Sequence, residues 1–346
     1  MSLVGENTGI LTQAQQQNST GEVDKLHIEE YGGKVERVIY EESLMRGYTS
    51  VQRVQGTDTV TNDRMGQGVL QAVVKGKRPE GAQIDFDAIS LKVDTMILAR
   101  NNVHHIDTFQ NRYDTRMEIG QDHGELLSEF YDEVFIIQAI KATSIEDGVY
   151  KGGQTGPGVG EGTNDLPTGW KGGTRITLDN AGDEGDPDKL ERAIEDMITN
   201  IKKNKVSPSK IAQGMLLVAP DEYATLMRND KLIDSTFSMG NGNYGQGKVL
   251  ASMGVRIVET NLIPQEKIDD HLLSNDKNNN AYDITSAEAK AKVIYCHPKS
   301  FLAGETVPLT SKVYYHDPEL QWFIDSYMMF GVTTNRGEYS GAVFAA

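Results

Sequence analysis

The stretch 107–143, DTFQNRYDTRMEIGQDHGELLSEFYDEVFIIQAIKAT, most constrains the fold because it predicts one helix of unusual length. It contains no proline, and Asp107 can cap its start. The apolar side chains that recur on one helical stripe are Leu127, Phe130, Tyr131, Val134, Phe135 and Ile137. At roughly 1.5 Å per residue the helix would approach about 50 Å, which is longer than a small globular domain needs. Gly120 and Gly124 are positions where it can bend.

Before this helix, the pattern from 49 to 103 changes to that of strands. The segments GVLQAVVKG at 68–76 and ISLKVDTMILA at 89–99 are rich in β-branched residues. Between them Pro79 and Gly81 supply a turn, so we predict a long two-stranded ribbon from 66 to 100. Because two strands alone are only marginally stable in water, we expect the ribbon to lie on another part of the structure.

The second half of the chain mixes helices and strands. A glycine-rich segment at 148–185 predicts a long irregular loop, and Asp186 and Pro187 then form an N-cap and first-turn pair. The apolar positions of the helix that follows are Leu190, Ala193, Ile194, Met197, Ile198 and Ile201. Strands are predicted at 214–219 and 254–260, and a short helix begins at Pro220. This order lacks regular βαβ alternation, so the predicted fold class is α+β.

Composition excludes some classes of protein. The net charge is −16, from 50 acidic and 34 basic side chains, which repels phosphate and argues against sequence-independent DNA binding. The single cysteine, Cys296, cannot form an internal disulfide, and we expect it to be a small buried residue. The first thirty residues lack the pattern of a secretory signal, and no apolar run is long enough to span a membrane. We therefore expect a soluble cytoplasmic protein.

A glycine loop at 238–254, SMGNGNYGQGKVLASMG, carries two partial phosphate-binding patterns. One has the GxGxxG spacing, at Gly240, Gly242 and Gly245, and the other has most of GxxxxGK[ST], at Gly242, Gly247 and Lys248. The second pattern lacks its hydroxyl because Val249 stands in the last position. The residues before the loop are polar and predict no strand, so a mobile loop is favoured over a nucleotide site.

Other groups of polar residues also fail as sites. His104 and His105 are adjacent and would point to opposite faces of a strand, so they would not share a metal. The acidic stretch 179–191 has Gly182 and Pro187 where a calcium loop needs a ligand and a continuous backbone. Three further histidines lie in polar turns where we expect solvated side chains, namely His271, His297 and His316. We therefore predict no enzyme, no catalytic residue, no metal and no cofactor.

Several strings resemble segments of the major capsid proteins of short-tailed, T-seven-like phages. They are DKLHIEEYGGKV at 24–35, NRYDTRMEIGQDHGELLSEFYDE at 111–133, MLLVAPDEYATLM at 215–227, GVRIVETNLIP at 254–264 and RGEYSGAV at 336–343. The resemblance keeps the family's order and implies the Hong Kong 97 type capsid fold. The parts that it implies are an N-terminal arm with a short helix at 1–48, an extended ribbon loop and its base at 49–103, a peripheral domain at 104–185 with the spine helix 107–143 and the glycine-rich loop, an axial domain at 186–320, and C-terminal strands at 321–346 that return to the peripheral domain.

The implied function is that of an icosahedral shell protein, found in the virion and assembled in the host cytoplasm. Its implied partners are further copies in pentamers and hexamers, a scaffolding protein during assembly, a portal protein at one vertex, and enclosed double-stranded DNA bound without sequence specificity, with no membrane. An encapsulin-type shell around a cargo protein and a nucleotide-binding enzyme using 240–248 remain as alternatives.

Two contact regions are also predicted, the first because a two-stranded ribbon has too little core to stand alone, and the second from the resemblance. On the ribbon, Lys75, Lys77 and Arg78 would meet acidic groups of a neighbouring subunit, with a solvated basic turn as the alternative. Near the centre of each ring, the backbone would bend at Gly240, Gly242, Gly245 and Gly247. Residues 1–20 would become ordered only against a partner, since they contain few large apolar groups.

Overall fold

The structure is a computed structural model that describes most of the chain after the N-terminal segment. The described residues are 35, 37–38, 43–78, 81, 83–84, 86–104, 115–145, 169–229, 232, 242–243, 248–249 and 251–346. Most of the N-terminal arm and short helix predicted at 1–48 lies outside this set, including residues 1–20, and so do the loop residues 148–168.

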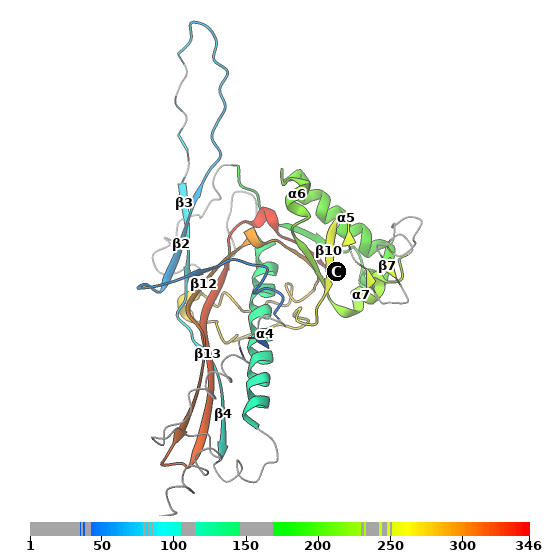
Figure 1. The fold of residues 1–346 in the computed structure, drawn as a ribbon. Coiled ribbons are helices and arrows are strands. Elements are labelled where there is room, and N and C mark those ends of the chain that lie inside the picture. The colour runs from blue at the N-terminus through cyan, green and yellow to red at the C-terminus, as the bar shows by residue number, and fades with distance from the viewer. Residues whose placement is uncertain are drawn as a thin grey trace, which may run out of the picture. The chain divides into compact units, whose positions relative to one another are not determined.

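Helices and strands both contribute to the described fold, which confirms the predicted α+β class (Figure 1). The α-helices are α4 Thr115–Ala142, α5 Pro187–Lys203, α6 Pro208–Ile211 and α7 Pro220–Leu226. Short 3₁₀ helices are η1 Asp183–Gly185, η3 Asp276–Asn278, η4 Pro298–Ser300 and η5 Gly337–Tyr339. The strands are β1 Val51–Arg53, β2 Thr59–Met65, β3 Phe86–Lys92, β4 Ile97–His104, β5 Thr174–Thr177, β6 Met215–Val218, β7 Gly242–Asn243, β8 Lys248–Val249, β9 Ala251–Ser252, β10 Val255–Glu259, β11 Ala291–Cys296, β12 Phe301–His316, β13 Gln321–Thr334 and β14 Gly341–Phe344.

The chain divides into two compact units. The small unit comprises 1–47, 95–131 and 307–329, and the large unit comprises 48–94, 132–306 and 330–346. The helix α4 and the strands β12 and β13 each contribute residues to both units. The five-part division predicted from the sequence uses other boundaries and stays a prediction.

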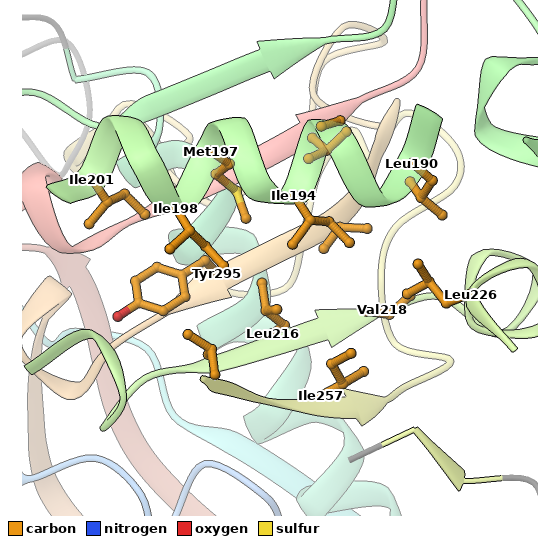
Figure 2. Packing of buried hydrophobic residues seen from close by; sticks show 14 of the residues in the cluster. Leu190, Ile194, Met197, Ile198, Ile201, Leu216, Val218, Leu226, Ile257 and Tyr295 are labelled. Atoms are coloured by element: carbon orange, nitrogen blue, oxygen red, sulfur yellow. The ribbon is translucent and has the colours of Figure 1, made fainter. Parts of the chain in front are cut away.

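The core of the large unit lies between α5 and a six-stranded sheet of order β5-β14-β11-β6-β10-β9. Strand β6 pairs with β10 in parallel and with β11 antiparallel. Figure 2 shows the apolar face of α5 directed at these strands, with Leu190, Ile194, Met197, Ile198 and Ile201 facing Leu216, Val218, Ile257 and Tyr295. Each such buried side chain contributes about 1.5–3 kcal/mol relative to an exposed one.

Local sequence determines where α5 begins. The Asp186 carboxylate accepts a hydrogen bond from the Asp188 amide at 3.1 Å, and Pro187 occupies the first turn, where its missing N–H leaves no bond unmade. The predicted helix start is therefore confirmed. A Cβ atom on Gly341 would lie 2.9 Å from Met197 Cγ, so the glycine allows β14 to approach α5 closely.

The strands β2 and β3 form the ribbon base, also in the large unit. They pair antiparallel from Thr59↔Lys92 to Met65↔Phe86. A Cβ atom on Gly304 of β12 would lie 2.7 Å from Val60 Cγ2, and one on Gly331 of β13 would lie 3.3 Å from Leu91 Cδ1. The ribbon base thus packs against the backbone of β12 and β13, in agreement with the expectation that the ribbon is supported.

The small unit is built around β4, which pairs antiparallel with β13 from His104↔Gln321 to Ile97↔Met328. The Arg100 guanidinium donates two hydrogen bonds of 2.7 Å to the Asp325 carboxylate across this pair. The helix α4 continues through Gly120 and Gly124 without a break. A Cβ atom on Gly124 would lie 2.8 Å from Val38 Cβ, so this glycine permits a close contact.

Candidate assembly surfaces

The residues 66–85 between β2 and β3 form the ribbon loop, which extends beyond the strand ends (Figure 1). Its described residues contain no strand, so the strand predicted at 68–76 is wrong for the single chain. Its apolar side chains are exposed, by 64% at Val69, 99% at Leu70, 74% at Val73 and 57% at Val74. The β-branched composition favours a strand, but a strand needs a hydrogen-bonding partner. Exposed apolar groups of this kind are typical of interaction sites.

The segment 89–99, predicted as one strand, is divided between the two units. Strand β3 ends at Lys92, and β4 begins at Ile97. Between them the Val93 amide donates to the Asp58 carbonyl at 2.8 Å, and the Asp94 carboxylate accepts from the Asn275 amide at 3.1 Å. The first bond extends the pairing of β3 by one residue, and Asp94 then binds a residue far along the chain. The sequence periodicity did not indicate that the strand ends here.

The basic tip, defined as Lys75, Lys77 and Arg78, lies on the ribbon loop. The Lys77 amide donates to the Val74 carbonyl at 3.0 Å, and Gly76 has a φ of +88°, which a tight turn requires and glycine adopts without strain. All three cationic side chains are exposed, and none forms an ion pair in the described part of the chain. The contact predicted for them with a neighbouring subunit stays a prediction.

A tryptophan anchors the end of the ribbon base. The Trp170 indole N–H donates to the Met65 carbonyl at 3.1 Å, and the guanidinium carbons of Arg64 and Arg336 lie 5.4 Å and 4.1 Å from the ring centroid. Buried Arg64 also lies 3.8 Å from the Asp87 carboxylate on the paired strand. Cation–π contacts of this kind stabilise by about 0.5–2 kcal/mol. This anchor was not predicted from the sequence. The feature that could have indicated it is a single tryptophan within a glycine-rich segment.

The glycine loop is described only in part. Gly242–Asn243 pairs antiparallel with Lys248–Val249, which makes a short hairpin. Gly240, Gly245 and Gly247 lie outside the described residues. The role predicted for this loop at a ring centre stays a prediction.

Two histidines expected to be solvated are buried, so those two predictions were wrong. His271 is 8% exposed and stacks on Tyr282, and His297 is 2% exposed and stacks on Tyr339. Burial lowers the pKa of His271. Burial also lowers the pKa of His297 to about 4, with smaller contributions from nearby lysines. Both imidazoles are therefore neutral at pH 7 and act as aromatic packing groups. His316 is half-exposed, near Glu319.

The remaining candidates differ in their surroundings. In the acidic stretch 179–191, the Asp183 carboxylate accepts from the Lys189 ammonium at 2.7 Å next to the start of α5. His104 ends β4, and His105 lies outside the described residues. Cys296 is fully buried, and burial raises the pKa of its thiol. The described residues contain no group of three or more His, Cys, Asp or Glu suited to a metal, and no helix among them could cross a membrane.

No protein-family model and no curated protein matches the chain. Solved structures do match. The mature capsid of bacteriophage PhiM1 is 22% identical, with a TM-score of 0.71 over 88% of this chain and 87% of that one. The capsid of cyanophage P-SCSP1u is 17% identical, with a TM-score of 0.72 over 88% of each chain. A Mycobacterium phage Che8 structure is 14% identical, with a TM-score of 0.56 over 83% of this chain and 84% of that one.

The chain has the Hong Kong 97 type capsid fold. The similarity covers most of this chain and most of each matched chain, so it concerns the fold as a whole and not one local motif. The predicted resemblance to phage major capsid proteins is thereby confirmed at the level of the fold. The short-tailed subtype stays a prediction.

Proposed function

We propose that this chain is the major capsid protein of a double-stranded DNA phage and that its copies assemble into an icosahedral shell. The observation that carries the proposal is the likeness of fold, over 88% of the chain, to two phage capsid structures. A fold alone hosts many functions, so the exposed ribbon loop adds separate support. Its apolar side chains would be covered by another copy in a shell. On this reading the chain is a structural protein without catalytic chemistry.

The ribbon loop is proposed to bind a neighbouring subunit. Burying Leu70, which is 99% exposed, would contribute about 1.5–3 kcal/mol per contact. The basic tip would then face carboxylates, which are in excess on this acidic chain. Replacing all three tip residues by Glu should impair assembly while leaving the circular dichroism of the subunit native.

A matched control changes the charge by the same amount elsewhere. Arg192, Lys203 and Lys205 are exposed cations on or just after α5, and their replacement by Glu should impair assembly less than the tip variant. Normal shells from the tip variant, or equal losses in both variants, would contradict the proposed role of the basic tip.

The glycine loop is proposed to lie at the centre of five- and six-membered rings. Subunits would converge there at two angles, and glycines allow the backbone to adopt both. Replacing Gly242 and Gly245 by Val should reduce the yield or uniformity of shells, whereas Lys248→Ala should have almost no effect. Micromolar ATP binding by the wild type that Lys248→Ala abolishes would refute this role and favour the nucleotide-binding alternative.

The remaining partners are proposals that follow from the capsid function. They are a scaffolding protein during assembly in the host cytoplasm, a portal protein at one vertex, and the enclosed genome. A net charge of −16 would keep a shell lining from adhering to DNA, which would then move freely during packaging. Residues 1–20 are proposed to be cleaved readily by protease in free subunits and more slowly in shells.

Electron microscopy of the purified protein, with sedimentation velocity, tests the main proposal. Uniform closed particles are the expected result, and a protein that stays monomeric at every concentration would refute self-assembly. The contents of native particles then distinguish the proposed phage capsid from the encapsulin alternative, because a phage capsid encloses DNA and an encapsulin-type shell encloses a protein cargo. Calorimetric titration with ATP and NAD tests the enzyme alternative, for which we expect no heat of binding.

A further inference from the structure

A polar pocket of about 550 Å³ lies in the large unit, beside β1 and the start of β12. Its polar lining residues are Ser50, Gln52, Asn62, Lys299, Asn335 and Arg336. Its apolar lining residues include Phe301 and Leu302, whose side chains are buried. The Asn62 amide donates to the Asn335 side-chain carbonyl at 3.2 Å, which leaves the amide group of Asn335 as a donor. The pocket therefore offers hydrogen-bond donors beside apolar lining residues.

Positive charge is concentrated around this pocket. The Lys299 ammonium is exposed and forms no ion pair within the described residues. Arg336 lies 3.2 Å from the Glu338 carboxylate, and the Lys210 ammonium lies 3.4 Å from the Tyr339 hydroxyl on the adjacent turn. Of these cations, Lys299 and Arg336 line the pocket. Arg336 is paired with Glu338 and lies over the Trp170 ring, so Lys299 gives the lining a net positive charge, whereas the whole chain carries a net charge of −16. Burial is the main cause of the lowered pKa of neighbouring His297, and the charges of Lys299 and Lys210 add to it.

One side of the pocket belongs to an edge strand. Among the described strands β1 pairs only with β12, through Val51↔Ala303 and two further residue pairs. Gln52 lines the pocket and is exposed, as is Arg53 beside it. An edge strand with unpaired backbone groups can bind an extended segment, while an adjacent pocket receives one of its side chains.

We infer that this pocket binds a carboxylate side chain carried by an extended segment of a second copy of this chain, an inference that rests on the proposed self-assembly. Charge selects this occupant, because each copy carries 50 acidic against 34 basic side chains and the pocket has the opposite sign. The basic tip of a neighbour is excluded as the occupant, since its cations would be repelled by Lys299 and Arg336. Donors from Ser50 and Asn335 complete the recognition of the carboxylate oxygens.

Zero-length carbodiimide crosslinking of assembled particles tests the inference, because it joins an amine to a carboxylate only at contact distance. Particles are assembled from a mixture of nitrogen-15 and unlabelled protein, so that mass spectrometry separates links between copies from links within one chain. Lys299 should be linked to an Asp or Glu of another copy. The pair Lys267 and Asp269, 2.7 Å apart, should be linked within one chain and serves as the positive control. The absence of a Lys299 link, or a link within one chain only, overturns the inference.

Charge reversal provides the second measurement. Lys299→Glu should raise the protein concentration needed for assembly about tenfold, which corresponds to about 1.4 kcal/mol per contact. Lys299→Met should raise it less, and Lys203→Glu on α5 is the control for which we expect a smaller change than for Lys299→Glu. Circular dichroism checks that each variant is folded. Particles that assemble equally well with Lys299→Glu refute the pocket alone, whereas a wild-type protein that never assembles refutes the proposed function and the pocket together.

Discussion

Gly304→Ala should destabilise the large unit, because the ribbon base lies directly on the backbone of β12 at this residue. The added Cβ atom would lie 2.7 Å from Val60 Cγ2, closer than nonbonded carbons approach, and 3.3 Å from Val54 Cγ2. Val60 is buried on β2, and its β-branched side chain has few alternative rotamers. The strain must therefore be relieved by moving the ribbon base away from β12.

The magnitude follows from two opposing effects. Overpacking in a well-packed core lowers the free energy of unfolding by about 1–3 kcal/mol. The change from Gly to Ala raises it by about 0.4–1 kcal/mol, because it restricts the unfolded chain. We expect a net loss of about 1–2 kcal/mol in the free energy of unfolding. Val60→Ala alone should cost a similar amount by leaving a cavity. In the double variant the methyl group added at position 304 fills part of that cavity, so the loss should be smaller than the sum by at least about 1 kcal/mol.

Urea unfolding of unassembled subunits measures these effects through tryptophan fluorescence. The chain has two tryptophans, and Trp322→Phe leaves Trp170, which contacts the end of the ribbon base, as the only reporter. Gly185→Ala is the control, since a Cβ atom there meets no atom within 4 Å, and it should be neutral or slightly stabilising. A Gly304→Ala protein within about 0.5 kcal/mol of the wild type, together with additive single and double variants, would refute the close packing.

Three further changes test individual polar groups. Tyr282→Phe should lower the free energy of unfolding by about 2–4 kcal/mol in urea titrations, because its hydroxyl donates to the Val332 carbonyl and accepts from the Val332 amide. Asp186→Ala should cost about 1 kcal/mol by removing the N-cap of α5. Stability should fall as the pH is lowered from 6.5 to about 4, by at most about 1.4 kcal/mol per pH unit, because the unfolded His297 binds a proton that the folded one does not; His297→Asn should flatten this slope.

Elements determined by neighbouring residues could be predicted from the sequence. The start of α5 depends on Asp186 and Pro187, and its buried face on apolar spacing alone. The strand β6 and the helix α7 that begins at Pro220 were predicted for the same reason, since their signals lie within a few residues. Burial of Cys296 also followed from its apolar neighbours in β11.

Contacts between distant segments could not be predicted. The stretch 272–284 looks like a polar loop, yet Asn275 and Asn278 form a reciprocal capping box there, and the Asn275 amide also binds the Asp94 carboxylate 181 residues away. Tyr282 in the same stretch reaches β13. His297 looks like a solvated turn residue because the sequence around it does not reveal the distant tyrosine that stacks on it. Such side chains are stabilised by partners that a local pattern cannot identify.

The ribbon loop differs from these cases, because no described strand of the chain pairs with its described residues. The sequence VLQAVV at 69–74 has strand propensity, which expresses how well side chains pack beside a paired neighbour and not a preference of an isolated backbone. Within one subunit these residues form no strand pairing, and Leu70 is almost fully exposed. A single subunit gains nothing in stability from such a segment, and its exposed apolar groups favour aggregation. Its presence is explained if the selected state is the assembled one, where a neighbouring copy supplies the missing contacts and the strand propensity acquires a partner.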